Sequence, residues 1–365
     1  MNINRVKIKN FKSLKDVDIN LSNLNLLTGV NSSGKSSFIQ ALLLLKQNED
    51  KFYSLRGDKT VNINDEYVQL GNKKDILFEE VFKENIEITI FLEDLQHSLI
   101  FNTDDLHIKF TKLLPDDKET FNLFYNDFQY ISTNRINPTI SYALSDKDVE
   151  KNLIGFSGEF TAHYLAQNRH KSILENLRHK DSKTTQLLEN VSLWLSEISE
   201  NIEVKAKVYE ELQSVDLKYA YTYGKTTTQD YTPLNVGFGI TYVLPIITSI
   251  LKAKEGDLII IENPETHLHP KAQSKIAQLC SKASANGIQI ILETHSDHIL
   301  NGIRVATKYC ILEPEQSKIY YFRKNRDELE TKIEQINIDK NGAIDRYPQG
   351  FFDQFDEDLD RLVEW

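Results

Sequence analysis

The stretch GVNSSGKS at residues 29–36 constrains the fold of this chain more than any other. It matches the pattern G-x-x-x-x-G-K-[ST], and it lies between a short apolar run at 24–27 and an apolar segment at 38–46. A glycine-bearing loop between a strand and a helix turns its backbone N–H groups toward phosphate, and the helix dipole favours negative charge there. We therefore predict a buried strand, a phosphate-binding loop and a buried helix, in that order.

The polar residues of this loop suit a nucleoside triphosphate with magnesium. Lys35 can reach the β- and γ-phosphates as a point charge, and the Ser36 hydroxyl can ligate Mg²⁺. A chance glycine turn is the alternative, but the flanking strand and helix favour the phosphate site. The predicted ligands are ATP and Mg²⁺, and the predicted nucleotide contacts are Gly29, Asn31, Ser32, Ser33, Gly34, Lys35, Ser36 and Ser37.

The stretch LIIIENPETHLHP, residues 258–270, reads as a buried strand that delivers the acid Glu262 to magnesium. Many nucleotide hydrolases place a second acid directly after the first, but here Asn263 follows. An amide can orient a water, yet it cannot accept a proton at neutral pH. Either Glu265 substitutes as the base, or turnover is slow and ATP acts mainly as a clamp. A positioned general base contributes on the order of 10²–10⁴ in rate.

Another predicted strand, QIILETHSD, ends at His295. A histidine at a strand end beside a phosphate site can donate a hydrogen bond to the γ-phosphate. Taken alone, His295 would be interpreted as a core histidine whose ring nitrogens have hydrogen-bond partners. In combination with the other motifs, we favour the functional role.

The stretch PLNVGFGITYVLPII, residues 233–247, places Gly237 and Gly239 before an apolar helix. The N-terminus of such a helix is an anion site, although a plain loop-to-helix turn is the alternative. One chain can supply only one γ-phosphate site. A second anion site makes sense if it closes over ATP bound to a partner chain.

Charge and composition limit the remaining classes. The formal net charge of −11 argues against nucleic-acid binding over the whole surface, although a local basic groove stays possible. Two cysteines cannot form a disulfide framework or a zinc cluster. The opening MNINRVKIKN has no signal-peptide pattern, and no apolar run is long enough to span a membrane. We expect a cytoplasmic protein without a membrane partner.

The order of the elements favours an α/β protein. Residues 1–21 and 50–145 read mostly as strands, 160–200 as helices, and from 237 onward helices and strands alternate. The acidic FFDQFDEDLDRL near the end is typical of a surface helix with a buried stripe. The histidines of HLH, His267 and His269, are two positions apart, so we expect no zinc site there.

Together these motifs resemble the ABC-type ATPase heads of the RecF, structural-maintenance-of-chromosomes and overcoming-lysogenization-defect group. The opening KIKNFKSLKDVDINLSNLNLLTGVNSSGKSS is similar to that group's first strands and Walker A loop. ENPETHLHP resembles its Walker B and D-loop, THS its switch segment, and NVGFG its signature. YPQGFFDQF resembles the C-terminal segment of a bacterial subgroup of ATPases, some tied to phage defence. The resemblance covers roughly residues 1–50 and 233–355.

The resemblance implies a fold and a set of roles. The fold would be one discontinuous P-loop ATPase head over 1–365, with a mixed β-sheet, an N-terminal β lobe, an insertion at 145–230, and C-terminal strands with an acidic tail at 306–365. Glu262 would take the Walker B position, Asn263 the usual catalytic glutamate position and His295 the switch position. Gln69 would join Ser36 and Glu262 at the metal, and Asn235, Gly237 and Gly239 would contact ATP across a dimer. The signature lacks its familiar serine; Val236 stands near that position.

Three functions are compatible with these motifs. The preferred one is a slowly hydrolysing ATPase that dimerises on ATP and regulates or scaffolds a separately encoded effector, such as a nuclease, in phage defence. The second is a DNA-repair ATPase that acts directly on DNA. The third is the ATPase subunit of a transporter.

Overall fold

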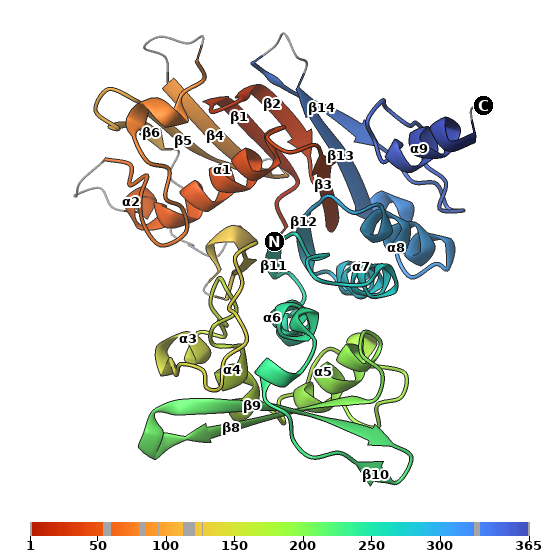
Figure 1. Cartoon of the computed structure of the whole chain (residues 1–365). Coiled ribbons are helices and arrows are strands. Elements are labelled where there is room, and N and C mark those ends of the chain that lie inside the picture. Colours follow the sequence, from red (N-terminus) through yellow and green to blue (C-terminus); the bar gives the residue numbers. More distant parts are fainter. Residues whose placement is uncertain are drawn as a thin grey trace. The chain divides into compact units, whose positions relative to one another are not determined.

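The computed structural model describes residues 2–53, 60–79, 85–93, 95–111, 121–125, 127–324 and 329–363. The chain divides into two compact units, each built from discontinuous segments. Helices and strands are interspersed along it, so the predicted α/β class is confirmed (Figure 1). Unit 1 comprises Met1–Tyr125, Ser317–Asn337 and Ile344–Trp365, and unit 2 comprises Asn126–Gln316 and Ile338–Ala343.

Unit 1 contains an antiparallel sheet of order β2-β1-β4-β5-β6, the predicted N-terminal β lobe. In β4, Ile86, Ile88 and Ile90 are buried while the residues between them are partly exposed. This period of two is expected of a strand with one face on a core. The bounds are β1 (Arg5–Phe11), β2 (Leu14–Asn20), β4 (Asn85–Leu92), β5 (Leu95–Asn102) and β6 (Ile108–Thr111).

The remaining strands of unit 1 form a mixed arrangement around β3 (Leu24–Gly29). Strand β13 (Ser317–Lys324) runs parallel to β3 and antiparallel to β14 (Thr331–Ile336). After β3 the chain turns into α1 (Lys35–Gln47), which is buried along most of its length and contacts β1, β3 and β4. The predicted strand, loop and buried helix are thus confirmed.

Unit 2 is organised around three parallel strands in the order β7-β11-β12. Strand β11 (Leu258–Glu262) and β12 (Gln289–Thr294) are almost entirely buried, as apolar runs in parallel sheets are. Strand β7 (Gln129–Ile131) is short and fully buried. Three helices accompany these strands, with α7 in contact with both others: α6 (Phe238–Lys252), α7 (Pro270–Ala285) and α8 (Asp297–Lys308).

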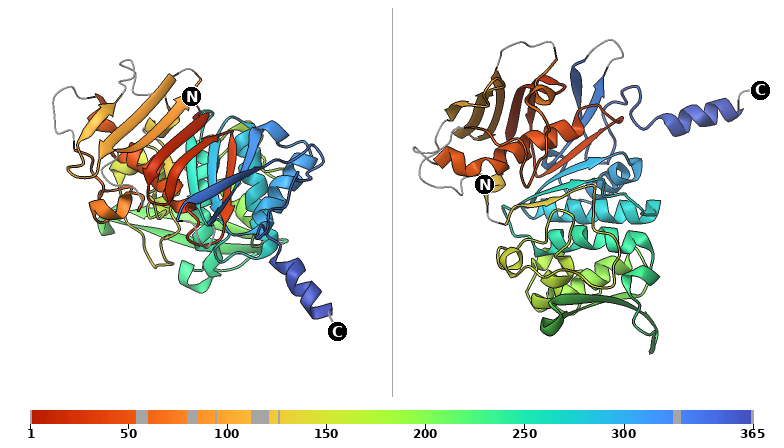
Figure 2. Two further views of the ribbon diagram at one scale, coloured as in Figure 1. Left: turned by 90° about the horizontal axis from the view of Figure 1, so that it is seen from above. Right: turned by 60° about the vertical axis from the view of Figure 1, so that its left-hand side comes forward.

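A lobe within unit 2 carries a second, smaller sheet. Strands β8 (Ile202–Tyr209), β9 (Ser214–Tyr223) and β10 (Thr226–Thr227) pair antiparallel. Helices α4 (Thr161–Gln167) and α5 (Leu187–Ser196) pack on β8 and contact α6 (Figure 2). The predicted helical stretch 160–200 is therefore broken, because its middle is rich in polar residues and folds as a loop held by the bridge between Ser172 and Gln186.

One predicted feature of the C-terminal segment is confirmed only in part. The helix forms as α9 (Gln354–Val363) and Phe351 before it is buried, but the later apolar residues Leu359, Leu362 and Val363 are 42%, 81% and 68% exposed. The sequence pattern predicts an amphipathic helix but not whether another element covers it. The other short helices are α2 (Glu49–Tyr53), α3 (Asp146–Glu150), η1 (Lys73–Ile76), η2 (Asn122–Phe124), η3 (Glu175–Leu177), η4 (Glu210–Leu212), η5 (Pro233–Asn235) and η6 (Pro314–Gln316).

Among the described residues, no helix has the length and apolar character required to cross a membrane. The division of the chain at 145–230 and 306–365 stays a prediction.

Candidate functional site

The loop from Gly29 to Ser36 in unit 1 has a backbone that only glycine permits at two points. Gly29 has φ +138°, and a Cβ there would lie 2.0 Å from the backbone oxygen of Phe322. Gly34 has φ +105°, and a Cβ would lie 2.5 Å from Oγ1 of Thr331. A side chain at either position would collide with the neighbouring strand, so both glycines are required by the local geometry.

Lys35 is held inside this loop. Its side chain is buried, with the residue 3% exposed, and Nζ donates to the carbonyl oxygens of Gly29 (2.8 Å) and Val30 (3.0 Å). The loop therefore fixes an ammonium group next to the N-terminus of α1, where no side chain caps the helix and no acid lies in the first turn. Positive charge and the N-terminus of a helix together suit phosphate.

The other predicted contacts of the loop lie where a ligand can reach them. Asn31, Ser32 and Ser36 are exposed and Ser37 is partly exposed, whereas Ser33 is buried and its carbonyl accepts a hydrogen bond from Thr331 Oγ1 (2.8 Å). Ser33 thus anchors the loop to β14. Gln69, the predicted metal ligand, is exposed, and its Nε2 donates to Asp65 O (2.8 Å); its role at a metal stays a prediction.

The ENPE turn follows β11 in unit 2 and has an unusual backbone. Asn263 has φ +46°, a left-handed conformation that asparagine tolerates better than most residues. Its N–H donates to the carbonyl of Glu293 on the neighbouring strand (2.8 Å). The Glu262 side chain, at the end of β11, is partly exposed and hydrogen-bonds the phenol of Tyr130, whose pKa is raised by burial and by Glu262.

Glu265 ties this turn to the end of β12. Its Oε2 accepts from Thr294 Oγ1 (2.7 Å) and its Oε1 accepts from the backbone N–H of His295 (2.7 Å). His295 is exposed, at the strand end where the sequence predicted it. The structure thus brings Glu262, Asn263, Glu265 and His295 to one edge of the parallel strands. Which of the acids or amides handles a water stays a prediction.

Sequence reasoning missed two residues at the same edge, Thr133 and Arg135. Thr133 Oγ1 lies 2.7 Å from Asn263 Oδ1 and 3.0 Å from Glu262 Oε2. The guanidinium of Arg135 is buried and donates to the backbone carbonyls of Glu262 and Asn263. Burial lowers the pKa of Arg135 to about 10, opposed by the nearby carboxylates, so the group remains charged at neutral pH. Only the parallel pairing of β7 with β11 could have revealed these residues.

The two glycines of NVGFG, at the start of α6, differ in their surroundings. A Cβ on Gly239 would lie 2.4 Å from the backbone oxygen of His267. Gly237 is exposed, has φ −58°, and a Cβ there would meet only Ile240 Cδ1 at 3.9 Å. Gly239 is therefore needed for packing within the chain, whereas neither backbone conformation nor packing within unit 2 requires glycine at 237. The nearby Asn235 is exposed, and its Nδ2 donates to Thr232 Oγ1 (2.9 Å).

The histidines of the HLH stretch have structural contacts. His267 packs against Phe238 and Tyr242, with ring centroids 4.8 and 5.0 Å away, and so joins the start of α6 to the turn after Glu265. His269 caps α7, its Nδ1 accepting from the N–H of Lys271. Within the described residues, no group of three or more histidine, cysteine or acidic side chains could hold a metal ion.

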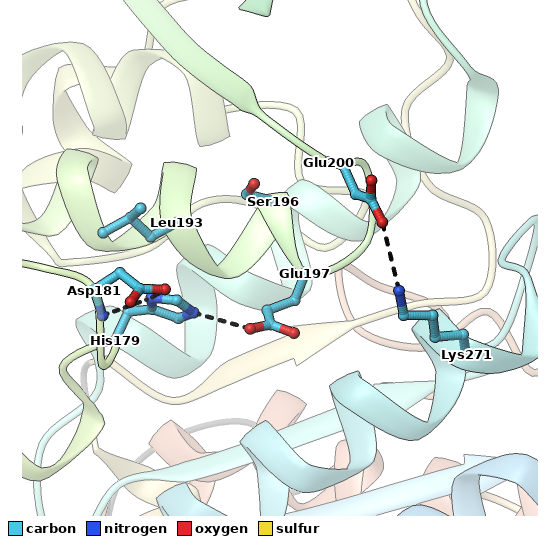
Figure 3. Close-up of a pocket in the computed structure, with 7 residues that line it drawn as sticks. All are labelled: His179, Asp181, Leu193, Ser196, Glu197, Glu200 and Lys271. Atoms are coloured by element: carbon cyan, nitrogen blue, oxygen red, sulfur yellow. Dashed lines mark hydrogen bonds and ion pairs between the residues drawn. The ribbon is translucent and has the colours of Figure 1, made fainter. Parts of the chain in front are cut away.

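Helix α7, which follows this turn, is anchored on the end of α5. Lys275 pairs with Glu197 at 2.9 Å and Lys271 with Glu200 at 3.6 Å. Figure 3 shows His179 between Asp181 and Glu197, beside the Glu200–Lys271 pair, around a polar cavity of about 180 Å³. Partly exposed ion pairs of this kind each stabilise little, but together they orient the helix.

Each unit carries residues whose chemistry fits ATP with magnesium. In unit 1 the ammonium group of Lys35 lies within the loop, and the Ser36 hydroxyl is exposed. In unit 2 a partly exposed carboxylate, Glu262, ends β11. Hydroxyl and carboxylate oxygens are ligands that Mg²⁺ prefers.

Comparisons with known proteins agree with this chemistry. A family model described as "AAA ATPase domain" matches residues 1–300, and one described as "Protein of unknown function (DUF3696)" matches residues 312–362. The comparison with curated proteins gives no match.

Two solved structures share the fold at low sequence identity. One is the SMC head bound to the C-terminal winged-helix domain of ScpA: TM-score 0.53, 13% identity, 92% of this chain and 98% of that chain covered. The other is the Smc head with an extended coiled coil bound to the C-terminal domain of ScpA, derived from Pyrococcus furiosus: TM-score 0.50, 13% identity, all of both chains covered. The fold is thus the mixed α/β head of SMC-type ATPases, and the chain is an ATPase that belongs to the AAA ATPase domain family.

Proposed function

We propose that this ATPase is an ATP-dependent dimerising switch with slow turnover, and that it regulates or scaffolds a separately encoded effector such as a nuclease in phage defence. The observation that carries the dimerising role is Gly237. Neither backbone conformation nor packing within unit 2 requires glycine at this exposed position, which lies at the uncapped N-terminus of α6. A glycine there suits close approach by a phosphate that belongs to another chain.

Within one chain, the proposed roles belong to the loop of unit 1 and the strand ends of unit 2. Gly29 to Ser37 bind the triphosphate, with Lys35 on the β- and γ-phosphates and Ser36 with Glu262 on Mg²⁺. His295 donates to the γ-phosphate. Magnesium, when bound, neutralises charge that develops on the phosphate oxygens. Asn235, Gly237 and Gly239 face the partner's ATP, although Gly239 has a packing role as well.

Slow turnover follows from the chemistry of Asn263. Its amide cannot accept the proton of an attacking water. Both oxygens of Glu265 accept hydrogen bonds from the end of β12, which hold this carboxylate at the strand end. ATP would then hold the closed dimer for long periods between hydrolysis events. The link to phage defence rests on the resemblance of the C-terminal segment to that of defence ATPases.

A direct DNA-binding role has less support. Two of the lysines on β8 and β9 are paired with acids: Lys205 lies 2.8 Å from Asp230, and Lys218 lies 3.6 Å from Asp216. A third, Lys207, lies over the ring of Tyr209. The two paired lysines do not add to the basic footprint that phosphate backbones require.

The test is the mass of the protein in solution with and without nucleotide. Wild-type protein with Mg²⁺ and the slowly hydrolysed analogue ATPγS should double in mass by light scattering. Gly237→Arg should remain monomeric but bind the nucleotide with unchanged affinity by calorimetry. Leu212→Arg, which adds the same charge on an exposed residue of the β8–β9 lobe, serves as the control and should dimerise. The proposal would be overturned if Gly237→Arg dimerises with nucleotide as strongly as the wild type.

A further inference from the structure

The segment after β7 holds the ENPE turn from the side opposite to β12. Strand β7 pairs in parallel with β11, with Ile131 opposite Ile261, so the residues that follow each strand leave the sheet at the same edge. Thr133 and Arg135 therefore contact Glu262 and Asn263, although they lie about 130 positions earlier in the sequence. Every contact in this group lies within unit 2.

The Thr133 hydroxyl lies between two acceptors. It is 2.7 Å from the Asn263 carboxamide and 3.0 Å from the Glu262 carboxylate, but it carries one proton. Two carboxylates sharing that proton would repel each other, whereas an amide beside a carboxylate does not. An asparagine at position 263 is therefore compatible with this threonine, and the Thr133 hydroxyl fixes the Asn263 amide next to Glu262, the proposed magnesium ligand.

Arg135 fixes the backbone of the same turn. Its two terminal nitrogens donate to the carbonyl oxygens of Glu262 and Asn263, with both contacts to Asn263 at 3.2 Å. The guanidinium also lies 6.0 Å from the ring centroid of Tyr242 on α6. The guanidinium holds its donors in a rigid planar fork, whereas the ammonium of lysine rotates freely on a flexible stem. This clamp opposes relaxation of Asn263 out of its left-handed conformation.

We propose that Thr133 and Arg135 are positioning residues for ATP hydrolysis, which act through Asn263 and Glu262 rather than on the nucleotide itself. Thr133 sets the orientation of the Asn263 side chain, and Arg135 sets the backbone that carries it. The inference rests on the proposed function in two respects, the ATPase activity and the position of Asn263 facing the reacting phosphate. It does not depend on dimerisation or on an effector.

The test is a double-mutant cycle read by single-turnover hydrolysis, which measures slow reactions. Thr133→Val removes the hydroxyl at nearly constant shape and should lower the rate about tenfold, as expected for one lost hydrogen bond of this kind, with ATP affinity within about twofold. Thr133→Ser should restore the rate. In an Asn263→Ala background, Thr133→Val should lower the rate clearly less than it does in the wild type, because only the contact with Glu262 remains to be lost.

Two further variants complete the design. Thr139→Val, in the same loop but bonded to Ser141 O, is the matched control and should leave the rate unchanged. Arg135→Lys should lower the rate without loss of ATP binding, and its melting curve reports whether the fold persists. The inference would be overturned if the rate losses of Thr133→Val and Asn263→Ala multiply in the double mutant. It would also be overturned if Thr133→Val hydrolyses ATP at the wild-type rate. If the wild type does not dimerise but the double-mutant cycle of Thr133 and Asn263 gives the expected result, only the proposed dimerising switch is rejected. Undetectable wild-type hydrolysis would also count against the inference, since no step would remain to position.

Discussion

The phosphate loop in unit 1 and the ENPE turn in unit 2 are built in opposite ways. The loop depends on backbone: two glycines with positive φ and a lysine whose ammonium is held by loop carbonyls. The turn depends on side chains from three places in the sequence: Thr133 and Arg135, Glu262 to Glu265, and Thr294. A backbone site is encoded locally, whereas a side-chain network is encoded across the fold.

This difference also separates binding from hydrolysis. The loop supplies charge and N–H groups, which act on phosphate in any state of the reaction. The turn holds groups that matter mainly when water attacks, and their positions depend on one another. Changes in the loop should therefore affect affinity, and changes in the turn should affect rate. Substitutions of Lys35, Glu265 and Asn263 test this separation, and a pair of glycine variants tests the start of α6.

Lys35→Ala should abolish measurable ATP binding. The substitution removes the buried ammonium and leaves the carbonyls of Gly29 and Val30 without their donor. We expect affinity to fall by at least about 100-fold, or roughly 2.7 kcal/mol. Isothermal titration calorimetry measures it, with Lys9→Ala, a surface lysine of β1, as the control. Unchanged affinity would mean that the loop does not bind phosphate.

Glu265→Gln should reduce hydrolysis by about 10²–10⁴ while ATP affinity stays within a few-fold. The change removes a proton acceptor and replaces one carboxylate oxygen, which accepts from Thr294 or the N–H of His295, with a donor. Steady-state turnover at saturating Mg-ATP is the measurement, and Glu203→Gln on β8 is the control. A wild-type rate of many turnovers per second that survives Glu265→Gln would refute both slow turnover and a role for this acid.

The strand, loop and helix around GVNSSGKS could be predicted well because their determinants are contiguous. GVNSSGKS, the apolar run before it and the buried helix after it define the loop without reference to the rest of the chain. The ends of β11 and β12 were also predicted, since apolar runs bounded by polar residues mark buried parallel strands. Gly237 and Gly239 read alike in sequence and proved different in packing.

Thr133 and Arg135 could not be predicted, for a physical reason. Strand β7 has three residues, too few to show a period, and STNR resembles any polar loop. The importance of these residues arises only because β7 lies next to β11, which is a property of the tertiary fold. The exposure of Leu359 and Leu362 on α9 likewise depends on what packs nearby and not on the helix pattern.

Gly239→Ala should destabilise the protein, and Gly237→Ala should not. A Cβ at 239 would overlap the carbonyl of His267, so the start of α6 or the turn after Glu265 must shift, at a cost of about 1–3 kcal/mol. At 237 the added methyl meets only Ile240 Cδ1, at an ordinary contact distance of 3.9 Å, so we expect a change within about 0.5 kcal/mol. Urea unfolding of the two variants gives the difference. Equal stabilities would show that the two glycines do not have the separate roles assigned to them.

The smallest expected effect comes from placing an acid at position 263. Asn263 has φ +46°, which aspartate tolerates nearly as well as asparagine, whereas glutamate at this φ costs about 1 kcal/mol or more. A carboxylate there could accept the proton of water, but it would share the Thr133 hydroxyl with Glu262, so its pKa would be raised. We therefore expect Asn263→Asp to raise turnover by less than about tenfold, and Asn263→Glu to raise it less or leave it unchanged.

The pH dependence of this variant decides whether position 263 faces the attacking water. Since a base acts only when deprotonated, turnover of Asn263→Asp should rise between about pH 6 and about pH 9, following its raised pKa, while the amide in the wild type contributes no such rise. Asn263→Ala, measured over the same range, should lack the rise. If Asn263→Asp is slower than wild type at every pH, with a parallel profile, then the side chain at 263 serves only to hold the turn, and the base lies elsewhere in the network.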